Sequence, residues 1–439
     1  MSPVTPKSSN KSPITRWLEN SPTAVLTIFA IVASFSTYFC MYAFRKPFSA
    51  ATYDGVKFFG SDIDLKTAFV ISQILGYTLS KYIGIKFCSE ATRAGRLWML
   101  GGLIIAAELA LLLFAVLPGE WKLIGIFLNG LPLGMVWGLV VLYLEGRRTS
   151  ELLLAGLSCS FILASGMVKD VGQWLIRDFG VSEYWMPSVT GLIFLVPFAI
   201  SIFLLNQIPE PTEDDISARA EREPMHRDER HTFLRRFLPG MLMLLVAYFF
   251  LTAYRDFRDN YGAEIFEELG YGGEPAIFTK TELPVAFGVM VALSALFLIK
   301  SNRLGLLGAY AIMLGGLLLM AGSTLLLDAG MIKGDVWMIC VGLGAYLTYV
   351  PFGSVLFDRL IALTRVTGTA VFAIYVMDAA GYTGSVGVQL YKDLVASDAT
   401  RLEFFRHFTY GMSLLGFVLL ACSCVFFMSL SKQNKSDAG

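Results

Sequence analysis

The sequence contains few charged residues for its length. Of its 439 residues only 16% are charged, and the 35 basic residues balance the 35 acidic ones. Soluble globular proteins carry about a quarter charged residues, so the composition excludes an ordinary soluble fold. A chain with no net charge also lacks the basic field that attracts nucleic acid, and no nucleic-acid partner is expected.

The residue types that build catalytic and metal sites are also scarce. There are three histidines, of which two lie in a polar segment (His226 and His231) and the third is His407. The six cysteines are scattered, mostly in apolar stretches, which favours packing over disulfides or metal ligands. The sequence contains no phosphate-binding P-loop and no nucleophile elbow. It therefore predicts no enzyme, no metal site and no cofactor.

What the sequence does contain is long hydrophobic stretches. Hydrophobic residues make up 55% of the chain, and a stretch of about 20 of them spans the core of a bilayer as a helix. The first stretch lacks a clear cleavage site, which favours an uncleaved helix over a signal peptide. We predict an all-α integral membrane protein of twelve transmembrane helices, at 23–44, 67–87, 97–117, 123–144, 152–176, 185–206, 237–254, 283–300, 304–327, 335–357, 367–390 and 407–430.

One polar segment, at 207–236, separates six of these helices from the other six. Its mixed charges are typical of a solvated linker, which can include a surface helix. Lysine and arginine are more frequent in the loops on the side of the termini, which predicts that both termini are cytoplasmic and that the protein lies in the plasma (inner) membrane. The predicted organisation is a tail (1–21), a six-helix bundle (22–206), the linker, a second bundle (237–430) and a tail (431–439).

The two predicted bundles contain matching sequences. YFCMYAFRKPF at 38–48 is matched by YFFLTAYRDFR at 248–258, which aligns Arg45 with Arg255. LPLGMV at 131–136 is matched by VPFGSV at 350–355. Because each half has an even number of helices, the two repeats share one orientation and pack about an axis along the membrane normal. This arrangement is that of the major facilitator superfamily.

The layout resembles that superfamily over nearly the whole chain. Two stretches, YAFRKPF at 42–48 and GYTLSKYIGIKFCSE at 76–90, are similar to its organophosphate:phosphate antiporter branch. In that branch an arginine of helix 1 and its repeat mate in helix 7 bind the phosphate. The resemblance implies that Arg45 and Arg255 are the phosphate ligands, with Lys46 and Lys81 as nearby cations.

The sequence departs from that branch at two places. The branch has a functional histidine in helix 5, where this chain instead has Lys169 and Asp170. The loop SEATRAGR at 89–96 only loosely matches the acidic-then-arginine signature of the superfamily. The resemblance is therefore specific for the fold, and the solute can differ.

The two repeated arginines are the most informative residues. A guanidinium at the centre of a membrane span costs at least about 2.5–3.5 kcal/mol, so it tends to face an internal site. Two such groups on opposite sides of one oxyanion can each form paired hydrogen bonds. The alternative is that Arg45 and Arg255 extend from helix ends to the outer headgroups. Tyr42, in the same motif, is a further candidate for the site.

Three more charged residues interrupt predicted helices. Lys169 and Asp170 are adjacent and cannot face each other on a helix, so each needs a partner elsewhere. Lys169 could be another cation of the site and Asp170 a carboxylate that couples transport to protons, or both could form structural ion pairs. Asp378 is a second coupling candidate, because burial raises the pKa of a lone carboxylate.

We therefore predict a secondary active transporter that moves a small anionic solute, an organophosphate or phosphate by resemblance, through alternating access. Arg45 and Arg255 would hold the anion. An exporter of amphiphilic compounds and a transporter-like sensor that binds without transport remain as alternatives. Exchange for a second anion and symport with protons are both open. The predicted partners are the solute and the lipid bilayer, and the chain is expected to be a monomer.

Overall fold

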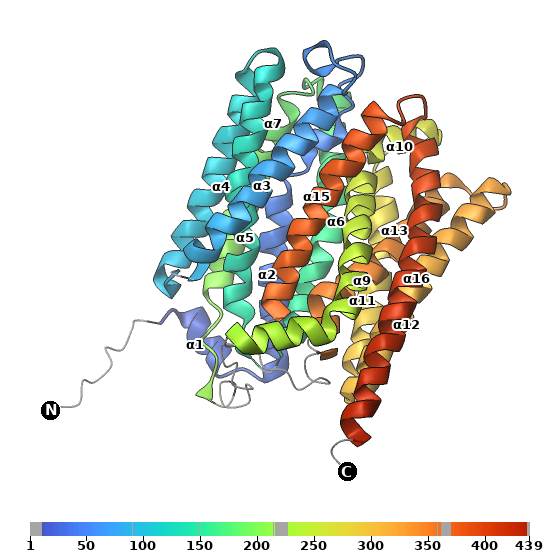
Figure 1. The fold of residues 1–439 in the computed structure, drawn as a ribbon. Coiled ribbons are helices and arrows are strands. Elements are labelled where there is room, and N and C mark those ends of the chain that lie inside the picture. The colour runs from blue at the N-terminus through green and yellow to red at the C-terminus, as the bar shows by residue number, and fades with distance from the viewer. Residues whose placement is uncertain are drawn as a thin grey trace.

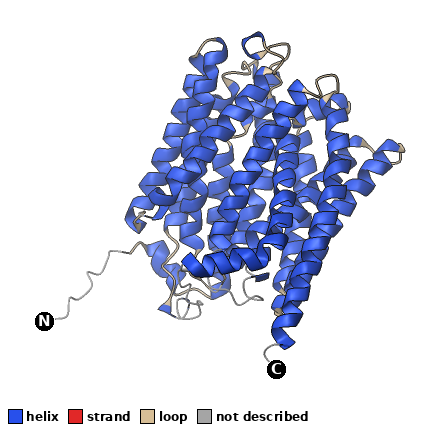
Figure 2. Cartoon of the chain, viewed as in Figure 1, coloured by secondary structure: helices blue, strands red, loops and turns tan. Residues whose placement is uncertain are grey.

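The computed structural model describes residues 11–89, 91–147, 149–213, 215, 227–357, 359–360 and 370–436. These residues are almost entirely helical, as Figure 2 shows. Both termini lie at the same end of the helical bundle in Figure 1. We call this end the terminal face and the opposite end the distal face.

The first half of the chain forms seven helices in the described residues. They are α1 (Pro13–Glu19), α2 (Thr23–Tyr42), α3 (Leu65–Ser89), α4 (Arg93–Val116), α5 (Lys122–Leu144), α6 (Ser150–Phe179) and α7 (Met186–Asn206).

The second half forms seven more helices among the described residues. They are α9 (Arg227–Asn260), α10 (Gly262–Glu268), α11 (Ile277–Phe297), α12 (Asn302–Asp328), α13 (Gly334–Pro351), α15 (Ala370–Leu394) and α16 (Arg401–Ser436).

Twelve of these helices have at least 18 residues, and they correspond one to one to the predicted spans. Ten stretches of the described residues are long and apolar enough to cross a membrane. The other two long helices are α3 and α15, which carry Lys81 and Asp378 and pack against each other. The prediction of a multi-pass, all-helical membrane protein is confirmed.

The main difference from the prediction lies at α9. Its first ten residues (227–236) belong to the segment predicted as linker, and Arg255 lies inside the helix, which continues to Asn260. In Figure 1 the start of α9 lies across the lower end of the bundle, and the rest of α9 runs along the length of the bundle. Pro239 lies within α9, where a proline removes a backbone hydrogen bond and bends the helix.

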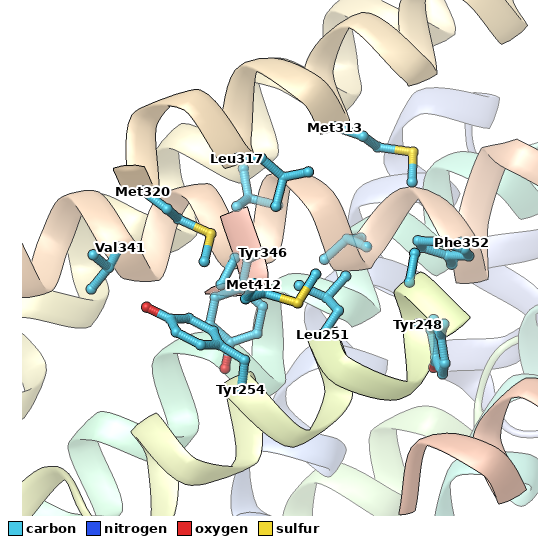
Figure 3. Close-up of a cluster of buried hydrophobic side chains, with 14 of the residues drawn as sticks. Tyr248, Leu251, Tyr254, Met313, Leu317, Met320, Val341, Tyr346, Phe352 and Met412 are labelled. Carbon is cyan, nitrogen blue, oxygen red and sulfur yellow. The ribbon is translucent and has the colours of Figure 1, made fainter. Parts of the chain in front are cut away.

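Each half has its own hydrophobic core. In the first half the core includes Phe69 and Phe114, and in the second it includes Trp337 and Phe405. Figure 3 shows part of the second core, where side chains of α9, α12, α13 and α16 meet. Because the two cores are largely separate, the halves can move relative to each other without exposing either core.

Glycines allow α3 and α5 to pack with their backbones in contact. A Cβ atom on Gly130 would lie 2.5 Å from the carbonyl oxygen of Gln73 and 2.8 Å from the amide nitrogen of Tyr77. A Cβ on Gly134 would lie 2.7 Å from the carbonyl oxygen of Tyr77. Close approach of this kind is typical of small residues in membrane helices. The close contact between α3 and α5 therefore fixes the position of Tyr77, which lies on α3.

Gly130→Ala should destabilise the protein, because real Cβ atoms do not approach backbone atoms this closely. Overpacking costs about 1–3 kcal/mol, so we expect a lower melting temperature in detergent. The matched control is Gly102→Ala in α4, where an added Cβ meets nothing within 4 Å. There alanine should leave the melting temperature equal or raise it, since it favours the helix by up to about 1 kcal/mol. Equal effects of the two substitutions would contradict the packing argument.

Candidate functional site

Arg45 lies where α2 ends, and two buried amide side chains hold this turn. Gln73 of α3 donates to the carbonyl oxygen of Arg45 at 3.0 Å and to the Oδ1 of Asn129 at 2.9 Å. Asn129 of α5 donates in turn to the carbonyl oxygen of Phe44 at 2.9 Å. Phe44 and Arg45 follow the end of α2 at Tyr42, so their carbonyl groups need partners outside the helix, and α3 and α5 supply them. The backbone beside Arg45 is therefore fixed.

The guanidinium of Arg45 is buried, and no described residue provides a counter-charge for it. Arg45 is 9% exposed, and its Cζ lies 4.0 Å from the centre of the Tyr77 ring and 5.7 Å from that of Tyr42. Among the described residues it forms no ion pair, and its Nε has no hydrogen-bond partner. A buried charge is normally paired. Stacking on tyrosine lowers the cost but supplies no negative charge.

Arg255, the repeat mate of Arg45, has a similar aromatic neighbour and a different charge balance. Its Cζ lies 4.1 Å from the centre of the Tyr349 ring of α13. Its Nη2 also pairs with Asp256 at 2.7 Å. Tyr42 lies close enough to both Arg45 and Arg255 to interact with each of them electrostatically. The two arginines thus belong to one region between the halves, and Arg255 is partly neutralised.

Lys81 and Asp378 join the two halves in the same region. Lys81 of α3 forms an ion pair with Asp378 of α15, which also accepts a hydrogen bond from the Tyr248 hydroxyl at 2.8 Å. The ammonium lies 5.5 Å from the ring of Tyr77 and 5.2 Å from that of Tyr382. Both charged side chains remain partly exposed, at 21% and 17%.

We call these residues the central cluster: Tyr42, Arg45, Tyr77, Lys81, Tyr248, Arg255, Asp256, Tyr349, Asp378 and Tyr382. Its charges are two ion pairs plus the single unpaired guanidinium of Arg45. The central cluster therefore carries one uncompensated positive charge. That charge can be balanced by an anion bound between the halves.

The other two predicted site lysines, Lys46 and Lys169, both bind one carboxylate of the second half. The Nζ of Lys46 lies 2.5 Å from Asp259 and that of Lys169 lies 2.7 Å from it. Ser165 also donates to Asp259, and Lys46 donates to Asn260 at 3.0 Å. In this conformation the two lysines hold the halves together. A role in binding the solute stays a prediction for both.

Two more contacts between the halves lie nearby. Lys66 pairs with Glu264 at 2.6 Å, and Asp64 pairs with Arg401 at 2.7 Å. Together with the pairs around Asp259 they form what we call the distal ion-pair layer: Lys46, Asp64, Lys66, Lys169, Asp259, Glu264 and Arg401. Every ion pair in it joins the first half to the second. The halves cannot separate on the distal side while these pairs remain.

Asp64 lies just outside α3. Burial raises the pKa of its carboxyl group, but the hydrogen bonds and charges of Lys57 and Arg401 outweigh this effect and hold the pKa below its usual range. The ion pair of Asp64 with Arg401 therefore stabilises the closed distal face fully at pH values above the ordinary aspartate pKa. This stabilisation is lost as the pH falls through the lowered pKa of Asp64.

Asp170 has a different kind of partner. Its carboxylate accepts hydrogen bonds from the backbone amides of Phe278 at 3.3 Å and Thr279 at 2.6 Å. These amides belong to the first turn of α11, where they lack partners within the helix and attract negative charge. Asp170 thus caps a helix of the other half. Its proposed role in coupling stays a prediction.

Sequence reasoning missed Tyr77 and did not single out Asp259, although spacing could have indicated both. Asp259 follows Arg255 by four residues in α9, and Tyr77 precedes Lys81 by four in α3. Residues four apart lie on the same helix face. Once Arg255 and Lys81 are candidates, the residues one turn away are candidates too.

Asp259→Asn should open the distal face, because it leaves Lys46 and Lys169 buried without a counter-charge. Breaking a buried pair by removing one partner costs about 3–5 kcal/mol, so the closed conformation should lose population. We expect labelling of Thr67→Cys by an impermeant maleimide from the distal side to rise about tenfold or more, with the native cysteines replaced by alanine. Thr67 is now fully buried and bonds Tyr261 across the halves.

The matched control for this experiment is Asp328→Asn. Asp328 pairs with Arg406 and with Tyr410 inside the second half, so its loss should not change the labelling. If both substitutions leave the rate unchanged, the pairs around Asp259 do not control closure.

Crystal structures of transporters share this fold. The chain superposes on a D-xylose-proton symporter with a TM-score of 0.60 at 14% identity, covering 92% of this chain and 97% of that one. For a mutant of the peptide transporter POT in complex with alafosfalin the TM-score is 0.59 at 16% identity, with 92% and 95% covered. For the nucleoside transporter NupG it is 0.56 at 12% identity, with 92% and 99% covered.

At these identities the likeness shows the fold, and the predicted major facilitator fold is confirmed. The predicted membership of the organophosphate:phosphate antiporter branch stays a prediction. No curated protein matches the sequence. A family model described as "Family of unknown function (DUF5690)" matches residues 47–430, and the chain therefore belongs to that family.

Proposed function

We propose that this protein is a secondary active transporter that moves a small anionic solute by alternating access. The observation that carries the proposal is the guanidinium of Arg45, which is buried between the two halves with no acidic partner among the described residues. A bound anion would supply the counter-charge that this guanidinium lacks among the described residues. The structural relatives, which carry nucleosides, xylose with protons, and peptides, support transport as the general activity.

The central cluster offers the anion two unequal ligands. Arg45 is free, whereas Arg255 is already paired with Asp256 at 2.7 Å. The repeat explains the difference, because the residue after the arginine is Lys46 in the first half and Asp256 in the second. We infer that Arg45 is the primary ligand. Arg255 contributes when the anion draws it partly away from Asp256.

Anion binding would also favour movement of the halves. An unpaired cation in the low-dielectric interior is costly, and a bound anion removes that cost for each conformation in which the site is buried. The site and the distal ion-pair layer share two chain segments. Arg45 is adjacent to Lys46, and Arg255 lies one helical turn from Asp259. A shift of either segment on binding would therefore reach the contacts that close the distal face.

Arg45→Lys should strongly reduce exchange of phosphate, organophosphates or carboxylates in proteoliposomes. Lysine keeps the charge but cannot form two parallel hydrogen bonds to one oxyanion. Hydrogen bonds to charged groups contribute about 1.5–3 kcal/mol, so the uptake efficiency should fall by about 10- to 150-fold. Counterflow of the radiolabelled anion, with the amount of inserted protein matched, measures the effect.

Arg406→Lys is the matched control for this measurement. Arg406 is a partly exposed arginine at the distal end of the second half, and its partner is Asp328. Its substitution should leave exchange unchanged. Equal uptake of every anion with and without Arg45 would refute the proposed function.

Coupling to protons is proposed to use Asp378. Asp378 lies in the central cluster between Lys81 and Tyr248, whereas Asp170 caps α11. An anion that draws Lys81 away leaves Asp378 free to take up a proton.

Asp378→Asn should therefore flatten the pH profile of transport. Asp170→Ala is the comparison variant, which should keep the profile and lower the melting temperature, since replacing a helix cap by alanine costs about 0.5–2 kcal/mol. The measurement is initial uptake between pH 5 and pH 8. A pH profile for Asp378→Asn identical to that of the wild type would exclude Asp378 as the coupling group.

A further inference from the structure

Aromatic side chains form a continuous series from the first half to the second. Tyr38 of α2 lies 5.6 Å from Tyr42 and 4.9 Å from Trp137 of α5, measured between ring centroids. Trp137 lies 6.3 Å from Phe161 of α6, and Phe161 lies 6.1 Å from Tyr346 of α13. The series thus crosses the boundary between the halves and begins beside Arg45.

A second set of rings flanks the charged groups. Tyr77 and Tyr382 face each other across the halves at 5.6 Å. In the second half Tyr248 lies 5.2 Å from Tyr349 and 5.0 Å from Phe352. These rings carry the contacts to Arg45, Lys81 and Arg255 described above. Every cation of the central cluster therefore has an aromatic neighbour.

Several phenol hydroxyls in this region have no protein partner. Tyr42, Tyr346 and Tyr382 are each less than 10% exposed, and their hydroxyls make no hydrogen bond within the described part of the chain. These hydroxyls are available to a bound molecule.

This environment differs from that expected around inorganic phosphate. A bare oxyanion is best bound by N–H donors on several sides, but beyond the arginines and Lys81 the central cluster presents mostly ring faces. Tyr38 also lies close enough to Arg45 to interact with it electrostatically, and the Trp137 ring follows at 4.9 Å from Tyr38. This arrangement suits a molecule with an anionic end and an extended flat part.

Resting on the proposed function, we propose that the solute is an organic anion that carries an aromatic ring. Its carboxylate or phosphate group pairs with Arg45, and its ring stacks among Tyr38, Trp137 and Tyr346. Tyrosine and tryptophan faces bind flat apolar surfaces, and their edges and hydroxyls accept or donate hydrogen bonds. The aromatic series thus selects the solute, whereas Arg45 supplies the charge.

The test compares phenyl phosphate with inorganic phosphate as ligands of the full-length protein in detergent, by isothermal titration. The wild type should bind phenyl phosphate at least about tenfold more tightly. Trp137→Leu should weaken phenyl phosphate by about 2- to 12-fold, the range for an aromatic pair, and leave inorganic phosphate unchanged. Arg45→Lys should weaken both ligands.

The matched control is Trp174→Leu. Trp174 forms an edge-to-face pair with Phe179 at 4.7 Å, much like the pair of Trp137 with Tyr38, but it is 47% exposed on the outside of the bundle. This substitution should change neither affinity. Tyr346→Leu in the second half tests the same aromatic series as Trp137→Leu. If one of the two variants does not fold, the other still tests the proposal.

The outcomes separate this inference from the proposed function. If phenyl phosphate and inorganic phosphate bind equally tightly, and both affinities depend on Arg45, the proposal of an aromatic solute is wrong, but the proposal of anion transport is retained. If phenol binds as tightly as phenyl phosphate, the anionic group is not recognised and both proposals fall. If phenyl phosphate is preferred but Trp137→Leu and Tyr346→Leu leave the preference intact, the ring does not bind in the aromatic series.

Discussion

The buried guanidinium of Arg45 is the constraint on which the rest of the site depends. Taking a charge out of water costs several kcal/mol unless a partner compensates it. Here the compensation within the described residues is limited to stacking on Tyr77 and Tyr42. The backbone next to Arg45 is held by Gln73 and Asn129, so the side chain is kept in place. The proposed anion site rests on this charge, which is kept in a fixed position.

The remaining interior charges form two groups, the distal ion-pair layer and the central cluster. On the distal side every described cation between the halves has a carboxylate of the opposite half, and Asp259 serves two lysines at once. In the central cluster the pairing is incomplete. The same segments supply both levels, because Lys46 follows Arg45 and Asp259 follows Arg255 by one turn. Binding and closure are therefore linked by covalent structure as well as by electrostatics.

Much of the fold follows directly from the sequence. Twelve apolar stretches produced twelve long helices, and the repeat of Arg45 and Arg255 placed both in one region. Backbone groups in a membrane must be satisfied within each segment, so hydrophobic length alone determines helices there. The surface helix at the start of α9 was one of two interpretations of the polar segment, because polarity does not distinguish a surface helix from a loop. The contacts of Gly130 and Gly134 with α3 became visible only in the tertiary structure.

The sequence by itself determined the class of protein, the number of helices, their duplication and the arginines worth testing. Only the tertiary structure decided which charges are free. Lys46, Lys169 and Asp170 were equivalent candidates in the sequence, yet each binds a group more than 80 residues away. Local patterns give the face and depth of a residue on its own helix. They cannot say which residue of another helix lies opposite, because that depends on how the two halves pack, and this pairing leaves Arg45 without a counter-charge.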